Sequence, residues 1–250
     1  MGRGDQVKIL YNIIFFLGVV FYGNSNALTS SVIIPCHHAH FKHLKELLLL
    51  LSQQTELPDE VVISLSEVNK VPASELKSLE LATYPFSLVI IKHPKQLNAG
   101  LNRNSACAHA KGDVFICQDA DDIPHPQRVE IIKHFFSNYD IDHLIHLYIP
   151  EWTQGNRPEW YWGLHQKEKI QFSELLRWSQ VAGSYFHGGN IAIKRTLFAQ
   201  IQWPDMAGGE DTKFNNMIIE NKKKSILLDV HLLIYRNYLS TVYASRVSKR

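Results

Sequence analysis

Residues 114–122 read Val-Phe-Ile-Cys-Gln-Asp-Ala-Asp-Asp, an apolar run that ends in three carboxylates. The apolar half predicts a buried strand, so the acidic half begins where the chain leaves the sheet. Carboxylates this close repel one another, and oxygen ligands suit a hard divalent cation such as Mg²⁺ or Mn²⁺. Asp is also common in solvated turns, and this stretch alone leaves that alternative open.

The composition is that of a globular chain that can build a full core. Of its 250 residues, 45% are hydrophobic and 20% are charged, and the formal net charge is +2. A charge this close to zero implies no polyanion-binding surface, so we expect no nucleic-acid partner. The three cysteines, Cys36, Cys107 and Cys117, have no metal-ligand spacing and favour packing over a disulfide framework.

The first 28 residues are expected to be a signal peptide or a short membrane anchor, because Arg3 and Lys8 precede the apolar run Ile9–Tyr22. That run is shorter than the ~20 residues that span a bilayer. Ser25-Asn26-Ala27 then offers small residues for cleavage. A signal peptide predicts the secretory or endomembrane lumen, and an anchor predicts membrane association, with the cytoplasmic face as the alternative. Residues 29–250 are expected to form the folded domain.

From residue 31 onward, short apolar runs alternate with amphipathic segments. Strands are predicted at 31–36, 60–65, 86–91, 113–117 and 191–193, and helices at 41–53, 98–110, 127–136 and 212–221. This β-α-β-α rhythm predicts an α/β fold with a mostly parallel central sheet that helices cover on both faces. Ligands of such sheets bind beyond the carboxyl ends of the strands, where the acidic cluster lies.

A second acidic centre, Gly208-Gly209-Glu210-Asp211, opens the helical segment 212–221. Two glycines let the backbone approach a ligand closely. Carboxylates are also favoured at a helix start by the dipole and the free N–H groups, so a purely helix-capping acid remains an alternative. The functional interpretation makes one carboxylate a general base for an incoming nucleophile.

Five segments, in order, resemble the family 2 glycosyltransferases of the GT-A fold. They are Ser31-Val-Ile-Ile-Pro35, the run from Asn98 to Val114, Asp119-Ala-Asp-Asp122, the run from His187 to Arg195, and Gly209-Glu-Asp211. With their flanks they cover residues 31 to about 236. The resemblance implies a Rossmann-like three-layer sandwich. It also implies an enzyme that moves a sugar from a nucleotide-sugar donor to an acceptor hydroxyl of a glycan, lipid or protein, with Mn²⁺ or Mg²⁺.

For the donor, the resemblance places Pro35 to His38 along the nucleotide pocket and Arg103 at the nucleotide, with Asn98 as a neighbouring candidate. A guanidinium can bind phosphate oxygens in bidentate fashion. Many relatives carry an Asp pair after the second strand that recognises the base, whereas this chain has Ser66 and Glu67. Either can accept a hydrogen bond from a base N–H. A uridine diphosphate sugar is the expected donor, although this departure leaves the base preference open.

For the metal, the resemblance assigns Asp119 and Asp121 to the ribose and the diphosphate-bound cation, with Asp122 orienting them. His231 is a candidate third ligand, although a strand histidine is more often structural. Besides His38, His187 and His231, the other ten histidines have no shared spacing that would indicate a separate metal site.

For the acceptor side, the resemblance makes Asp211 the catalytic base, assisted by Glu210. One base and a single displacement predict inversion at the anomeric carbon. His187, Gly188 and Gly189 are expected to border the acceptor or the sugar. Trp160 belongs to an aromatic-rich loop whose rings either stack on sugars or pack in the core.

Two other classes of protein are alternatives to this enzyme. A nucleotidyltransferase is expected to carry a glycine-rich loop with Arg and Lys after the first strand, and residues 35–42 lack one. A non-catalytic nucleotide-sugar or carbohydrate-binding domain of the same fold is expected to lose its acidic pairs. This chain keeps both pairs, yet that alternative stays open at the level of sequence.

Overall fold

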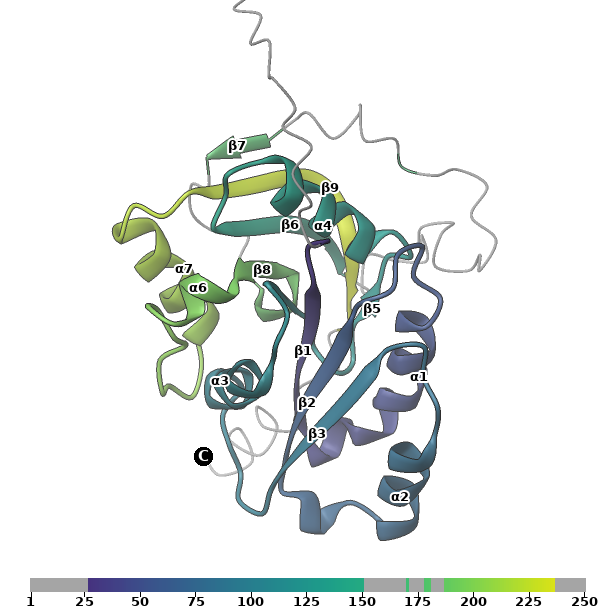
Figure 1. Ribbon diagram of the computed structural model, residues 1–250. Helices are drawn as coiled ribbons and strands as arrows, with labels where there is room; N and C mark the ends of the chain where they lie inside the picture. The colour runs from purple at the N-terminus through teal and green to yellow at the C-terminus, as the bar shows by residue number, and fades with distance from the viewer. Residues whose placement is uncertain (1–26, 151–169, 171–177, 181–186, 237–250) are drawn as a thin grey trace, which may run out of the picture.

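The computed structural model describes residues 27–150, 170, 178–180 and 187–236. In chain order, its helices and strands are β1 (Ser30–His37), η1 (His38–His40), α1 (Phe41–Leu51), β2 (Glu60–Ser66), η2 (Val68–Lys70), α2 (Ala73–Leu81), β3 (Ser87–His93), α3 (Ala99–His109), β4 (Val114–Cys117), β5 (Ile123–Pro124), α4 (Arg128–Asn138), β6 (His143–Pro150), β7 (Trp178–Gln180), η4 (Gly188–Asn190), β8 (Ile191–Lys194), α6 (Arg195–Phe198), α7 (Glu210–Glu220) and β9 (Ser225–Tyr235). All the described strands join one sheet, in the order β3-β2-β1-β4-β8-β6-β9-β5 with β7 beside β9 (Figure 1).

The sheet divides into a parallel part and a mixed part. β3, β2, β1 and β4 run parallel, and their Val and Ile residues suit a strand that is buried on both faces. From β4 to β8 and from β8 to β6 the pairing becomes antiparallel, and β6 then pairs with β9 in parallel. The predicted α/β class with a Rossmann-like sheet is confirmed, and the antiparallel pairs lie in its C-terminal half.

Alternate side chains of the central strands pack into two hydrophobic cores, one on each face of the sheet. Val32, Ile34 and Cys36 of β1 point to the core that α1, α2 and α4 cover. Ile33 points to the opposite core, where α3, α6 and α7 pack. A period of two along a strand sends neighbouring residues to opposite faces, so the middle of β1, Val32–Ile34, is a continuous apolar run. Figure 1 shows the resulting layers, with α1 and α2 on one side of the sheet and α3 and α7 on the other.

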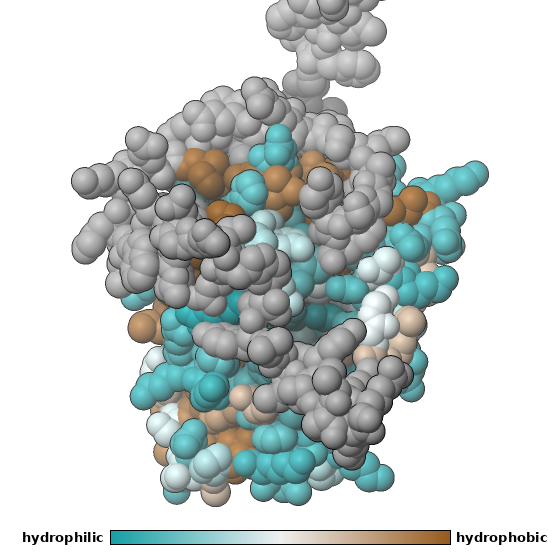
Figure 2. Space-filling view, turned by 180° about the vertical axis from the view of Figure 1, so that it is seen from behind, coloured by the Kyte–Doolittle hydropathy of each residue, from teal (hydrophilic) through white to brown (hydrophobic). Residues whose placement is uncertain are grey.

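The predicted strands and helices are confirmed with ends that differ by at most two residues. Sequence periodicity missed the helices α2 and α6, the long strands β6 and β9, and the short strands β5 and β7. β6 and β9 form one long parallel pair with register shifts between His146 and Leu147 and between Leu147 and Ile149. Such irregularities break the alternation of apolar and polar residues on which the prediction of a strand depends. From behind, apolar side chains gather in the upper part of the molecule, where β6 and β9 lie, and hydrophilic ones are visible below them (Figure 2).

The N-terminal segment 1–26 lies outside the described residues, so its role as a signal peptide or anchor stays a prediction. Among the residues that the structure describes, no helix is both long and apolar enough to span a membrane. Cys36, Cys107 and Cys117 are all buried free thiols, as their places in apolar segments predicted.

Acid should destabilise the fold through buried histidines. Burial lowers the pKa of His125 to about 4 and that of His143 to about 3, and it lowers the pKa of His146 well below its usual value. His146 Nε2 accepts a hydrogen bond from Arg128 Nε at 2.9 Å, which requires a neutral ring. In the unfolded chain these rings titrate near pH 6.5. Between pH 6.5 and 5 the unfolded state therefore binds protons that the native state excludes.

We expect the free energy of unfolding to fall as the pH drops from 6.5 to 5, by up to ~1.4 kcal/mol per pH unit for each such histidine. His40 and Asp122 act in the opposite sense, since the hydrogen bond with Asp121 raises the pKa of His40 and burial raises the pKa of Asp122, but the buried neutral histidines outnumber them. Urea unfolding at several pH values measures this slope, and His143→Gln should make it shallower. A flat profile between pH 6.5 and 5 would contradict the buried neutral state of these rings.

Candidate functional site

Three loops meet at the carboxyl end of β4. Asp119, Asp121 and Asp122 follow that strand, His187 precedes η4, and Glu210 opens α7. Gln118 N still donates to Ile33 O at 2.9 Å, so the acidic turn begins where the parallel ladder ends. The predicted position of the acidic cluster at the end of a buried strand is what the structure shows.

Arg103 joins the two acidic centres. Its Nη2 donates to Asp119 Oδ1 at 2.7 Å, and its Nη1 donates to Glu210 Oε1 at 3.1 Å. The guanidinium side chain is only 3% exposed, so these are charge-assisted hydrogen bonds in a site of low dielectric. Burial alone would lower the pKa of Arg103, but the charges of Asp119 and Glu210 raise it. One cation therefore holds together carboxylates that lie 91 positions apart in the chain.

The position of Arg103 follows from the start of α3 and from a glycine. Asn98 caps the helix, because its Oδ1 accepts from Leu101 N at 2.9 Å, and its Nδ2 donates to Asp205 Oδ1 at 2.6 Å. Gly188 packs directly against the guanidinium, where a Cβ would lie 1.8 Å from Nη2. The expected contact of Arg103 with a phosphate stays a prediction, and in this structure both of its Nη groups bind carboxylates.

His187 lies between the carboxylates. Its Nε2 is 3.6 Å from Asp119 Oδ2, and its Nδ1 is 3.7 Å from Asp122 Oδ2. Nδ1 also accepts from Gly189 N at 3.1 Å, which assigns the ring proton to Nε2 on the side of Asp119. Burial lowers the pKa of His187, and among the charges that oppose this shift are those of Asp119, Asp211 and Asp121. The two acidic centres thus converge on a single imidazole.

Asp119 and Asp122 have opposite pKa shifts. Burial acts to raise the pKa of Asp119, but Arg103 and His187 outweigh it, so the pKa lies below its usual value. Burial and the negative charge of Asp119 raise the pKa of Asp122 well above the usual value. Asp122 Oδ1 accepts from Arg236 N at 2.9 Å, while the buried Oδ2 has no hydrogen-bond partner among the described residues. That orphaned oxygen, aimed at His187, is an acceptor still available to a cation or a proton.

Asp121 and Asp211 are both partly buried, and neither binds Arg103. Asp121 Oδ2 is 3.0 Å from His40 Nδ1, a partner that sequence spacing did not reveal. Asp211 is partly buried in the first turn of α7, and its Oδ1 accepts from Thr212 N at 2.7 Å. Gly209 caps this helix with a positive φ of 73°, a left-handed conformation that glycine adopts without strain. The helix dipole favours the charged form of a carboxylate there.

The aromatic wall of the site was missed from the sequence. The ring of Tyr235 lies 4.1 Å from that of His187, and the ring of Tyr148 lies 5.4 Å from it, centroid to centroid. Burial raises the pKa of Tyr148, and the charge of Asp211 raises it further. β6 and β9 supply these two tyrosines, so the long strand pair that periodicity missed also forms part of the site.

The buried cation Arg128 supports the site through several hydrogen bonds. Its Nη2 donates to Cys117 O and to Gly189 O, each at 2.7 Å, and its Nη1 donates to Gln118 Oε1 at 3.2 Å. These bonds tie the end of β4 to the turn of η4. Gly188 and Gly189 are buried in that turn, and a Cβ on Gly189 would lie 3.1 Å from Asp122 Oδ2. That the two glycines border the acceptor or the sugar stays a prediction. Sequence reasoning missed Arg128, because an arginine at a helix start carries no sign of complete burial.

The residues predicted to contact the donor lie in different surroundings. Pro35 lies on β1 opposite Ser64 and close to the strand end. Ser66 is fully buried, its hydroxyl accepts from Asn102 Nδ2 at 3.2 Å, and it lies 3.5 Å from Cys36 O. A hydroxyl in that network is poorly placed to meet a base, whereas Glu67, the next residue, emerges at the strand end. Trp160 and the rest of its aromatic loop lie outside the described residues.

The side chains whose positions suit a metal ion are only partly the ones predicted from the sequence. Among the described residues, the ligand atoms of Asp119, Asp122 and His187 all lie within 4.8 Å of one another. Asp121 and His231 are not in this group. His231 is exposed on β9, four residues from Tyr235, which is ~13 Å along an ideal strand. The roles of Asp121 and His231 as ligands stay predictions.

Residues 31–202 match the family model described as glycosyl transferase family 2, which is more than half of the chain. Over 224 residues the chain is 27% identical to an uncharacterized glycosyltransferase of Methanocaldococcus jannaschii, covering 88% of this chain and 74% of the relative.

Two solved structures share the fold. Staphylococcus aureus TarS in complex with UDP-GlcNAc aligns with a TM-score of 0.67 and 18% identity, over 87% of this chain and 61% of TarS 1–349. The mannosyltransferase PcManGT of Pyrobaculum calidifontis, in complex with GDP-Man and Mn²⁺, aligns with a TM-score of 0.63 and 18% identity, over 90% of this chain and 61% of its own. The chain therefore spans less than two thirds of these solved chains.

Gly188→Ala should disrupt the bridge at Arg103. The new Cβ would meet the guanidinium at 1.8 Å, whereas a Cβ at the exposed Gly208 meets nothing within 4 Å. Overpacking of this kind costs about 1–3 kcal/mol. We expect Gly188→Ala to lower the free energy of unfolding in urea by that amount and Gly208→Ala to change it by less than about 0.5 kcal/mol. Equal stability of the two variants would contradict the close packing of Gly188 on Arg103.

Proposed function

Because the chain belongs to glycosyl transferase family 2, we propose that it transfers a sugar from a nucleotide-sugar donor to an acceptor hydroxyl, with a divalent cation and with inversion at the anomeric carbon. The observation that carries the proposal is the convergence of the two acidic centres. Arg103 binds Asp119 of one centre and Glu210 of the other. Asp211, the next residue after Glu210, and Asp121 both act on the pKa of His187. The proximity of the candidate metal-binding carboxylates and the candidate base to the same imidazole supports the proposal.

The residues after β4 fit a divalent cation. Asp119 keeps Oδ2 free of Arg103, Asp122 Oδ2 is buried without a hydrogen bond, and both face His187. Carboxylate oxygens are the donors that Mg²⁺ and Mn²⁺ prefer. Asp119, Asp121 and Asp122 would hold the cation, and His187 would complete the group. When bound, a cation supplies Lewis-acid neutralisation of the charge that develops on a leaving diphosphate.

The remaining chemistry falls to residues of the chain. Asp211 accepts the proton of the acceptor hydroxyl, because it is only partly buried and its carboxylate is not bound to Arg103. Glu210 is bound to that guanidinium and so positions the start of α7. Arg103 keeps Asp119 ionised and ready to bind a cation. One base and no protein nucleophile give a single displacement, which inverts the anomeric carbon.

The donor class rests on the structural neighbours. TarS was solved with UDP-GlcNAc and PcManGT with GDP-Man and Mn²⁺, which supports a nucleoside diphosphate sugar and a divalent metal for this chain. A screen of uridine, guanosine and cytidine sugars with Mn²⁺, read out as release of the nucleotide, identifies the base and the sugar.

Asp→Asn substitutions should separate the base from the cation-binding residues. We expect Asp211→Asn to lower the rate of transfer by about two to four orders of magnitude, the usual contribution of a general base, while donor affinity with Mn²⁺ is kept. Asp121→Asn should instead weaken donor binding in the presence of metal. Calorimetric titration of the donor and an assay of nucleotide release measure the two effects.

Asp140→Asn is a matched control, since Asp140 is an exposed carboxylate beyond α4. It should bind and transfer like the wild type. Equal transfer by the wild type and Asp211→Asn would remove the proposed base. Donor binding without any transfer or hydrolysis in the wild type, across the whole screen, would favour a non-catalytic binding domain.

A further inference from the structure

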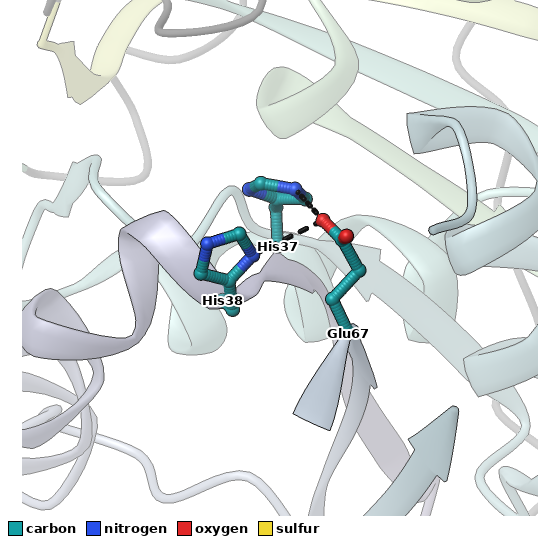
Figure 3. A group of neighbouring side chains, drawn as sticks. All are labelled: His37, His38 and Glu67. Carbon is teal, nitrogen blue, oxygen red and sulfur yellow. Dashed lines mark hydrogen bonds and ion pairs between the residues drawn. The ribbon is translucent and has the colours of Figure 1, made fainter. Parts of the chain in front are cut away.

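A second group of metal-capable side chains lies at the ends of β1 and β2. His37 ends β1, His38 begins η1, and Glu67 follows the last residue of β2. His37 Nε2 is 2.6 Å from Glu67 Oε2, and His38 Nδ1 is 3.1 Å from the same oxygen. Figure 3 shows both rings turned toward the carboxylate. Because His37 is paired with Ser66 across the parallel ladder, Glu67 lies beside the two histidines, although it is 30 positions away in the sequence.

The spacing of the donor atoms suits one small cation. The three ligand atoms lie within 4.8 Å of one another. Four ligands placed ~2.0–2.1 Å from Zn²⁺ in a tetrahedron are ~3.3 Å apart. The observed separation of 3.1 Å already matches this value, and the 2.6 Å pair needs to open by less than an ångström. The third pair, the two ring nitrogens, also lies within 4.8 Å.

An unpaired nitrogen supports a ligand at this place. His38 Nδ1 is buried and has no hydrogen-bond partner among the described residues, even though Glu67 lies 3.1 Å away. A buried polar atom without a partner is costly. Glu67 also has φ 54° and ψ 42°, a left-handed conformation that is strained for a residue other than glycine. Lys70 binds only the other oxygen, Oε1, so Oε2 remains directed at the rings.

We propose that His37, His38 and Glu67 form a binding site for a transition-metal dication of the Zn²⁺ class, separate from the carboxylate group after β4. Two imidazoles and one carboxylate are a donor set that Zn²⁺ favours, whereas Mg²⁺ prefers oxygen ligands alone. Three protein ligands leave a fourth position for water or an external ligand. The ion would join the end of β1 to the turn after β2.

The site requires a defined arrangement of protons. His37 Nδ1 accepts a long hydrogen bond from Ala39 N at 3.3 Å, and Nε2 lies on the carboxylate. A metal on Nε2 moves the ring proton to Nδ1, so the contact with Ala39 N is given up. His38 offers Nδ1, which has no hydrogen bond to lose. Glu67 exchanges its contact with His37 for the cation and keeps Lys70 on Oε1.

Cobalt titration of the untagged full chain tests this site. Co²⁺ replaces Zn²⁺ in such sites, and four-coordinate Co²⁺ has intense visible absorption bands. We expect these bands to appear with one equivalent of Co²⁺ and to be displaced by Zn²⁺. We further expect Zn²⁺ to raise the melting temperature, because a ligand that binds only the native state stabilises it. His38→Gln and Glu67→Gln should weaken Zn²⁺ binding at least about tenfold.

Matched controls locate the ion. His109→Gln removes an exposed histidine at the end of α3 and should leave the Co²⁺ bands and the Zn²⁺ affinity unchanged. His187→Gln removes the imidazole of the other group and should also leave the bands in place. Circular dichroism confirms that each variant is folded. Bands that survive in both His38→Gln and Glu67→Gln, or that disappear in His187→Gln, would overturn the proposal, as would the absence of Co²⁺ or Zn²⁺ binding to the folded wild type.

Discussion

The buried guanidinium of Arg103 is the constraint on which the arrangement of the site depends. It binds Asp119 at the end of β4 and Glu210 at the start of α7, and α3 carries it. A buried charge that loses a partner typically costs 3–5 kcal/mol, so the three segments cannot move apart freely. The packing of Gly188 against the same group adds η4 to the assembly. A single cation thus fixes the geometry of four segments that are distant in the sequence.

This arrangement gives the carboxylates different environments and therefore different chemistry. Asp119 is held ionised by Arg103, while burial raises the pKa of Asp122. Asp211 lies outside the bridge, in the first turn of α7, with the helix dipole favouring its charge. Acidic residues whose pKa values are pushed apart can take separate roles in one reaction. A cation-binding group and a base can therefore coexist within one small cluster.

The sequence predicted what depends on local pattern. The apolar runs at 31–36 and 60–65 identified β1 and β2, and the acidic turn after β4 lies where the strand order placed it. The sequence did not predict contacts that depend on how neighbouring strands align in the sheet. His37 and His38 have no visible partner in the sequence, because Glu67 comes from the neighbouring strand. Ser66 seemed available to a base, yet Asn102 of α3 engages its hydroxyl in the folded chain.

A double-mutant cycle on unfolding measures how strongly Arg103 couples the two acidic centres. Asp119→Asn, Glu210→Gln and the double variant are compared with the wild type in urea. Either single variant leaves the guanidinium one carboxylate, whereas the double variant leaves a buried cation with neither. We expect the double variant to lose more free energy of unfolding than the sum of the single losses, by roughly 0.5–3 kcal/mol. Losses that add to within about 0.3 kcal/mol would contradict this coupling.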